Sequence, residues 1–271
     1  MSPVFEIIPE AIFFQQTNLI CEISCDGFSY IFENDIDKKF YGLSVFYFNN
    51  DEDVAEQLKT IFNEQPLLNK NYKQVVVIYT GSESALLPEE LYKPGKNDLL
   101  LSTLYGDINE GTIATDFIAD KKIYNVYKMP AAIHQIIISQ FPLAAFNHLY
   151  SLLIKQKVAD NDLLKIIFYR DTFIAVLLKE GKLQLVQTYL YLSGTDVAYH
   201  ILNICKQFNL IDLPLQITGM IEINSDLHKE LSHYFKNIFF GELPAGYEFA
   251  KDLKELPPHY FSHLFSFALC V

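Results

Sequence analysis

The alternation of hydrophobic and polar residues near the N-terminus predicts three strands followed by a helix. LICEISCDGFSYIFEND and FYGLSVFYFNN, within residues 19–50, hold three apolar runs separated by short polar stretches. Asp26-Gly27 and residues 33–35 are the turn positions, because Asp-Gly is among the commonest pairs in tight hairpins. Residues 51–65 then repeat apolar side chains at helical spacing after an acidic start, which suits a helix N-terminus.

A buried strand and a strand-to-helix junction follow this meander. KQVVVIYTGSES, from Lys73 onward, contains a near-continuous apolar run, which is typical of a strand buried on both faces. In IYNVYKMPAAIHQIIISQFP, Met129-Pro130 predicts a change from strand to helix, because proline is tolerated in the first turn of a helix. The start of the chain therefore continues as alternating strand and helix.

The same order of elements occurs a second time. KIIFYRDTFIAVLLKEGKLQLVQTYLYL, residues 165–192, again holds three apolar runs, with a turn at Arg170-Asp171. SGTDVAYHILNICKQFNL predicts a helix capped by Thr195 or Asp196, LPLQITGMIEINS a strand, and SDLHKELSHYF a further helix. Asp-Val-Ala opens both first helices, and Thr-Gly closes both of the strands that follow. A repeat of such a long period predicts two similar domains rather than a solenoid.

These patterns predict an α/β fold of two related units, each a mixed sheet with a three-stranded antiparallel meander flanked by helices. The polar stretch at residues 157–162 is the predicted boundary, which gives a first domain at 1–160 and a second, smaller one at 161–271. The C-terminal stretch PPHYFSHLFSFALC predicts an aromatic helix. This helix either packs on the second domain or forms a partner-docking surface, since exposed apolar patches often mark interfaces.

Composition excludes several classes of partner. The chain has 271 residues, 50% of them hydrophobic, and a formal net charge of -12, which indicates an ordered globular protein without the clustered Lys and Arg that nucleic acid or anionic lipid requires. No basic N-terminal region precedes a long apolar stretch, and polar residues interrupt the most apolar region, so we expect a cytoplasmic protein without membrane insertion. The four cysteines form no C-x-x-C pair, which favours thiols over a metal or disulfide site.

The duplicated pattern resembles the actin-like ATPase superfamily, whose halves are ribonuclease H-like. LICEISCDGFSYIFEND, IYNVYKMPAAIHQIIISQFP, GTDVAYHILNICKQFNL and PLQITGMIEINSDLHKELSHYF carry the resemblance. Nearly the whole chain is similar to an uncharacterised bacterial family of that superfamily, and its architecture is similar to actin-like components of pilus and secretion assembly. The resemblance implies two actin-like domains. Fold alone does not fix function.

In catalytic members of that superfamily, one hairpin per domain holds the nucleotide phosphates. Its pattern is roughly Asp-x-Gly followed by Ser or Thr, so that backbone N–H groups can approach phosphate oxygens. The first hairpin here reads Asp26-Gly27-Phe28-Ser29, with the glycine one residue early and Phe28 in the place that the pattern leaves open. An ordinary Asp-Gly turn explains this stretch without a ligand.

The second hairpin and the adenosine element depart from the family pattern as well. Arg170-Asp171-Thr172-Phe173 holds no glycine, and the Gly-Gly pair that contacts adenosine in the family is represented by Gly219-Met220. If nucleotide binds, the resemblance implies that the following residues line the site in an altered arrangement: Asp26, Ser29, Asp171, Thr172 and Gly219.

Three functions are compatible with these observations. The first is a non-catalytic cytoplasmic scaffold or adaptor that binds a protein partner and needs no cofactor. The second is an ATPase or nucleotide switch with ATP and Mg²⁺ between the domains. The third is a peptide-binding or dimerising module that uses an exposed sheet edge, and a homodimer is compatible with the sequence. No catalytic residue is predicted, and His259 and His263, four residues apart, lack an evident third metal ligand.

Overall fold

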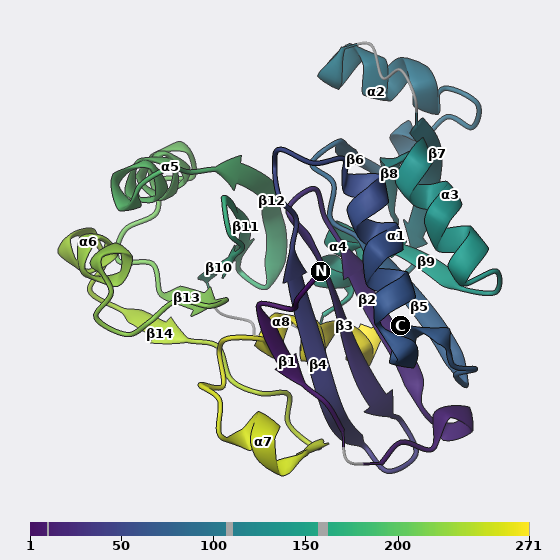
Figure 1. Ribbon diagram of the computed structural model, residues 1–271. Helices are drawn as coiled ribbons and strands as arrows, with labels where there is room; N and C mark the ends of the chain where they lie inside the picture. Colours follow the sequence, from purple (N-terminus) through teal and green to yellow (C-terminus); the bar gives the residue numbers. More distant parts are fainter. Residues whose placement is uncertain (10, 107–110, 157–161, 271) are drawn as a thin grey trace. The chain divides into compact units, whose positions relative to one another are not determined.

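The computed structural model describes residues 1–9, 11–106, 111–156 and 162–270 (Figure 1). Contacts divide the chain into two compact units. Unit 1 comprises Met1–Lys155 and Gly246–Leu253 together with Cys270, and unit 2 comprises Gln156–Ala245 and Lys254–Leu269. Most of the predicted boundary stretch, residues 157–161, lies outside the described residues, so the domain limits 1–160 and 161–271 stay a prediction.

The main sheet of unit 1 has the strand order β1-β4-β3-β2-β5-β9, with β15 beside β4. β2, β3 and β4 form the antiparallel meander, whereas β5 and β9 join it in parallel. The strands are β1 (Phe5–Ile7), β2 (Asn18–Ile23), β3 (Gly27–Asn34), β4 (Lys39–Tyr47), β5 (Gln74–Tyr79), β9 (Ala145–His148) and β15 (Glu248–Phe249), and the helices are α1 (Val54–Glu64), α3 (Ala131–Gln140) and α4 (Leu149–Lys155).

A small antiparallel sheet is inserted between β5 and α3. Its strand order is β6-β8-β7, and α2 accompanies it. The bounds are β6 (Ser84–Pro88), α2 (Asn97–Tyr105), β7 (Gly111–Ile118) and β8 (Ile123–Pro130). β8 ends at Pro130 and α3 begins at Ala131, which confirms the predicted strand-to-helix junction.

Unit 2 repeats the main sheet of unit 1. Its strand order is β12-β11-β10-β13-β14, with an antiparallel meander at β10, β11 and β12 and parallel partners at β13 and β14. The bounds are β10 (Leu163–Phe168), β11 (Thr172–Lys179), β12 (Lys182–Leu190), α5 (Gly194–Gln207), β13 (Leu215–Thr218), α6 (Asp226–Tyr234) and β14 (Ile238–Phe240). They are followed by α7 (Lys251–Lys254), of which only Lys254 belongs to unit 2, and by α8 (Ser262–Phe267). The predicted duplicated α/β fold is thereby confirmed.

The two meanders match down to single hydrogen bonds. In the first hairpin the Ser24 N–H donates to the Gly27 carbonyl at 3.0 Å, and in the second the Tyr169 N–H donates to the Thr172 carbonyl at 2.9 Å. The pairing of the second and third strands is interrupted in both units by a register shift after the sixth residue pair. This shift makes the positions of β4 and β12 directly comparable.

The repeated tripeptides, in contrast, do not mark equivalent positions. Ile23 of β2 and Phe168 of β10 occupy equivalent positions, each one residue before its hairpin turn. Ile23 pairs with Tyr79, the residue before Thr80. Thr218, in contrast, pairs with Ile167, the residue before Phe168. The two Thr-Gly pairs are therefore out of step.

The helix caps differ too. Asp53 is the N-cap of α1, but Ser193 caps α5, and Asp196 completes a capping box three residues later. The cap predicted at Thr195 or Asp196 is wrong for this reason.

Each unit has its own hydrophobic core. In unit 1, apolar side chains of α1 and α3 pack on one face of the meander, and in unit 2 those of α5 pack on β10, β11 and β13. Side chains of α8 are buried as well. Within the described residues, no helix combines the length and the apolar character that spanning a bilayer requires.

Candidate functional site

The first hairpin turn is closed by a serine hydroxyl. Ser24 Oγ accepts hydrogen bonds from the backbone N–H groups of Asp26, at 3.1 Å, and Gly27, at 3.0 Å. A serine that bonds backbone groups two and three residues ahead builds a turn by itself. The amides that a phosphate-binding turn would present to a ligand are thus already engaged within the chain.

Gly27 is required by its neighbouring strand. A Cβ atom at this position would lie 2.3 Å from the backbone oxygen of Phe46 on β4. Because that distance is far below any real contact, only glycine allows β3 and β4 to approach this closely. The Asp-Gly pair therefore has a structural explanation that needs no ligand.

The next two side chains point to opposite faces of the sheet, as successive residues of a strand do. Phe28 is buried in the core of unit 1, where its ring meets Phe62 of α1 edge-on at 5.5 Å. Phe28 is thus a core residue and does not occupy an open place at the turn. Ser29 lies on the other face, and its hydroxyl donates to Glu22 Oε2 at 3.4 Å.

Glu22, a buried acidic residue next to the first hairpin, was not among the predicted site residues. It is buried on β2 next to the carboxyl end of that strand, whereas Asp26 lies in the turn, where its carboxylate accepts from the Cys25 thiol at 2.9 Å. Ligands of open α/β sheets bind beyond the carboxyl ends of parallel strands. In the sequence, Glu22 is an acidic residue near the end of the first predicted strand, and this position could have indicated it as a candidate site residue.

The second hairpin is a plain, partly exposed turn. Arg170 Nε and Asp171 Oδ2 are 3.6 Å apart, and both side chains are at least 40% exposed. Thr172 is the first residue of β11 and pairs with Leu190 of β12. The exposed ion pair of Arg170 and Asp171 contributes little to stability.

Gly219 closes the end of β13 against the rest of unit 2. Its φ of +108° favours glycine, and a Cβ would lie 2.3 Å from the carbonyl oxygen of Phe168. Its N–H donates to the His259 carbonyl at 2.9 Å, and His259 Nε2 donates to the Ile221 carbonyl at 2.8 Å. The chain itself therefore covers the carboxyl end of β13, the place where sheets of this type bind ligands.

A buried histidine fixes the ends of the parallel strands in unit 1. His148 Nε2 donates to the Gly81 carbonyl at 2.9 Å, while Nδ1 accepts the Tyr150 N–H at 3.1 Å. Burial lowers the pKa of His148 to about 4. Its backbone N–H donates to Asp116, whose other oxygen accepts the Tyr127 hydroxyl. Both ring nitrogens are thus engaged in the neutral form, and these contacts tie the ends of β5 and β9 together.

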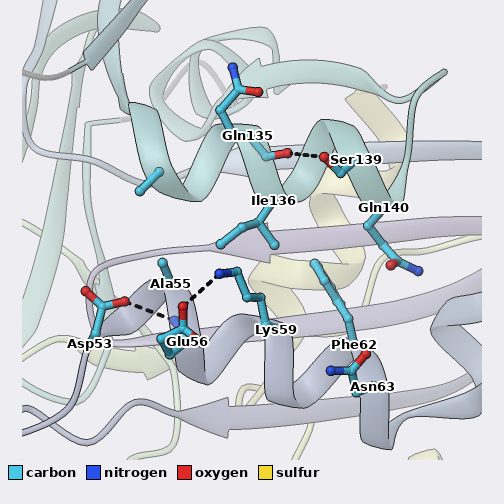
Figure 2. A pocket seen from close by; sticks show the side chains of 11 residues that line it. Asp53, Ala55, Glu56, Lys59, Phe62, Asn63, Gln135, Ile136, Ser139 and Gln140 are labelled. Carbon is cyan, nitrogen blue, oxygen red and sulfur yellow. Dashed lines mark hydrogen bonds and ion pairs between the residues drawn. The ribbon is translucent and has the colours of Figure 1, made fainter.

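A groove of about 810 Å³ runs between α1 and α3 (Figure 2). Its lining residues are Asp53, Ala55, Glu56, Lys59, Phe62, Asn63, Ala132, Gln135, Ile136, Ser139 and Gln140. Lys59 Nζ pairs with Glu56 Oε1 at 2.7 Å on one wall, and Ser139 donates to the Gln135 carbonyl on the other. Lys59 and Ser139 therefore have partners within their own helices. No group of three or more His, Cys, Asp or Glu residues in the described ranges could hold a metal ion.

A family model that matches residues 11–238 decides the affiliation of the chain. The chain belongs to the family described as proteins of unknown function, DUF3822. No curated protein matches this DUF3822 member in sequence.

Solved structures similar to this DUF3822 member share the actin-like ATPase fold. A Bacteroides thetaiotaomicron VPI-5482 protein, described as having that fold and unknown function, is 18% identical with a TM-score of 0.80, over 96% of this chain and 100% of the other. A chain of the PilM–PilN type IV pilus biogenesis complex is 12% identical with a TM-score of 0.57, over 94% and 98%. The ethanolamine utilization protein EutJ of Carboxydothermus hydrogenoformans is 8% identical with a TM-score of 0.52, over 94% and 90%. These likenesses show the fold, and they confirm the resemblance that the sequence indicated.

The five candidate nucleotide residues of this DUF3822 member are divided between the units. Asp26 and Ser29 belong to unit 1, on either side of buried Phe28. Asp171, Thr172 and Gly219 belong to unit 2, where Gly219 packs against the strand that leads into the second hairpin. Whether these residues bind nucleotide stays a prediction.

Proposed function

We propose that this DUF3822 member is a non-catalytic actin-like protein that acts as a cytoplasmic scaffold or adaptor through protein–protein contacts. The observation that carries the proposal is the Ser24 hydroxyl, which accepts the amide hydrogens of Asp26 and Gly27. A phosphate group would have to displace this hydroxyl, and each hydrogen bond lost costs about 0.5–1.5 kcal/mol.

Unit 2 supports the proposal independently. Its hairpin has no glycine, and the Gly219 N–H is bonded to the His259 carbonyl. The Tyr260 hydroxyl donates a hydrogen bond to Glu222, three residues after Gly219. The elements that hold phosphate and adenosine in catalytic members of the superfamily therefore have intramolecular partners here.

We infer that the binding partner of this fold is another protein. The PilM–PilN structure is a protein complex of type IV pilus biogenesis, and its likeness to this chain supports a role in an assembly of that kind. The inserted segment supplies exposed apolar side chains at Leu91, Leu99 and Leu104. Leu99 and Leu104 lie on α2 and Leu91 precedes it, and exposed apolar residues within one inserted segment favour contact with another protein.

Calorimetric titration of the full chain with ATP and Mg²⁺ tests the absence of nucleotide binding. We expect no binding heat and no thermal shift at about 1 mM ATP. Binding tighter than about 100 μM, which would stabilise the fold by roughly 1.4 kcal/mol at that ATP concentration, overturns the proposal if Asp171→Ala abolishes it. Asp120→Ala is the matched control, because Asp120, like Asp171, is exposed and paired with a basic residue adjacent in the sequence, here Lys121.

That overturning result would favour the alternative, a nucleotide switch with ATP and Mg²⁺ at an altered phosphate site. The scaffold itself is tested by affinity capture from cells with Leu99→Glu on α2 and with Asn203→Glu, which adds the same charge on the exposed face of α5. A specific partner lost with Leu99→Glu and kept with Asn203→Glu supports it. Equal capture by both variants contradicts a role for this surface.

A further inference from the structure

The two units treat one sheet edge differently. In unit 1, the third strand of the meander, β4, is covered by β1, which pairs with it antiparallel through Phe5, Glu6 and Ile7. In unit 2, the equivalent strand β12 is the last of its sheet among the described residues (Figure 1). An edge strand presents backbone N–H and C=O groups that can pair with another strand.

The common register shift identifies which residues correspond. Counted from the hairpin, the third to fifth pairs involve Val45, Ser44 and Leu43 in β4 and Thr188, Gln187 and Val186 in β12. β1 pairs with those same three residues of β4. An incoming strand is therefore expected at residues 186–188.

In unit 2, a side chain occupies the backbone acceptor that is equivalent to the one used in unit 1 by Val4, the residue before β1. The Val45 carbonyl accepts the Val4 N–H at 2.8 Å. At the equivalent position, the Thr188 carbonyl accepts the side-chain amide of the adjacent Gln187 at 3.3 Å. This exposed amide stands where a backbone N–H of another strand would donate.

The composition of β12 favours a copy of itself. From Leu183 to Leu190 the strand contains neither proline nor a charged residue, although the chain carries a net charge of -12. Leu190 is 76% exposed, and Leu192, just beyond the strand, is 98% exposed. Natural proteins protect long edges with charges, proline, bulges or short strands, and the stretch of β12 from Leu185 to Leu190 has none of these.

We propose that β12 pairs antiparallel with β12 of a second copy of this chain, on a two-fold axis at Gln187. Such a self-complementary contact is the commonest interface of homodimers. The pairing sets Gln187 against Gln187 of the second copy, and two neutral amides can donate to and accept from each other. It also sets Leu185 against Tyr189, an aliphatic–aromatic pair of the kind that stabilises sheets. The inference does not rest on the proposed function, because it involves no nucleotide residue.

Sedimentation equilibrium of the full chain between about 1 and 500 μM tests the proposal. We expect a reversible dimer with a dissociation constant in that range, since an interface of one strand pair is small. Gln187→Lys and Gln187→Glu each place like charges opposite each other on the axis and should weaken the dimer at least about tenfold. An equimolar mixture of the two variants should restore the dimer as a heterodimer. Asn203→Lys, on the exposed face of α5, is the control with the same added charge.

Rescue in the mixture supports the proposal and shows that both variants are folded. A wild-type chain that stays monomeric at the highest concentration overturns it, as does a dimer that both variants leave intact. Saturable binding of an extended peptide of another protein at β12, with no dimer, also overturns the proposal and assigns the edge to that partner.

Discussion

Replacing Gly27 by alanine tests whether this glycine serves the sheet or a ligand. The added Cβ would lie 2.3 Å from the Phe46 carbonyl oxygen, so β3 and β4 would have to separate by about 1 Å to restore ordinary contact. Overpacking of this kind typically costs about 1–3 kcal/mol. Urea unfolding, followed by circular dichroism and tyrosine fluorescence because the chain has no tryptophan, should show a midpoint lowered by about 0.5–1.5 M.

Gly81→Ala is the matched control. This glycine follows β5 in the same unit, and a Cβ there would have only an ordinary contact, 3.7 Å from the Lys128 carbonyl oxygen. We expect Gly81→Ala to be neutral or slightly stabilising, because it lowers the entropy of the unfolded chain. A Gly27→Ala protein as stable as the wild type would refute the reasoning, and glycine at this turn would then need another explanation, such as a ligand.

Three further outcomes follow from the structure. Lowering the pH from 7 to 4 should reduce the free energy of unfolding by about 3 kcal/mol through His148. The folded pKa of His148, about 4, lies below the unfolded value of 6.5, so the unfolded chain takes up the proton first. A His148→Gln protein whose stability falls as steeply with pH as that of the wild type contradicts this. Gly219→Ala should destabilise unit 2 more than Gly95→Ala destabilises unit 1, because both have positive φ but only Gly219 faces a backbone oxygen; equal losses in urea unfolding would show that the close approach does not matter. Ser193→Ala removes the capping box of α5 and should cost about 1 kcal/mol in the same assay. A loss no larger than that of Thr195→Ala would show that Ser193 does not cap the helix.

The local elements of this fold were predictable because they depend on short-range patterns. The turn at Asp26-Gly27, the amphipathic helix from Val54 and the junction at Pro130 are each specified within a few residues. The order of strands and helices in the two halves, and hence the duplication, could be read from the same patterns. The cap of α5 was misplaced because Ser193, Thr195 and Asp196 can all cap a helix, and only the observed hydrogen bonds choose between them.

The chemistry of the candidate site could not be predicted in the same way. Gly27 and Gly219 have their roles because distant backbone oxygens, of Phe46 and Phe168, approach them. The sequence by itself determined that two similar α/β units follow each other, since hydrophobic periodicity is a local property. Only the tertiary structure decided that Ser24 closes the first turn and that β1 covers β4 while β12 remains an edge, because strand register and close backbone approach arise from residues far apart in the chain.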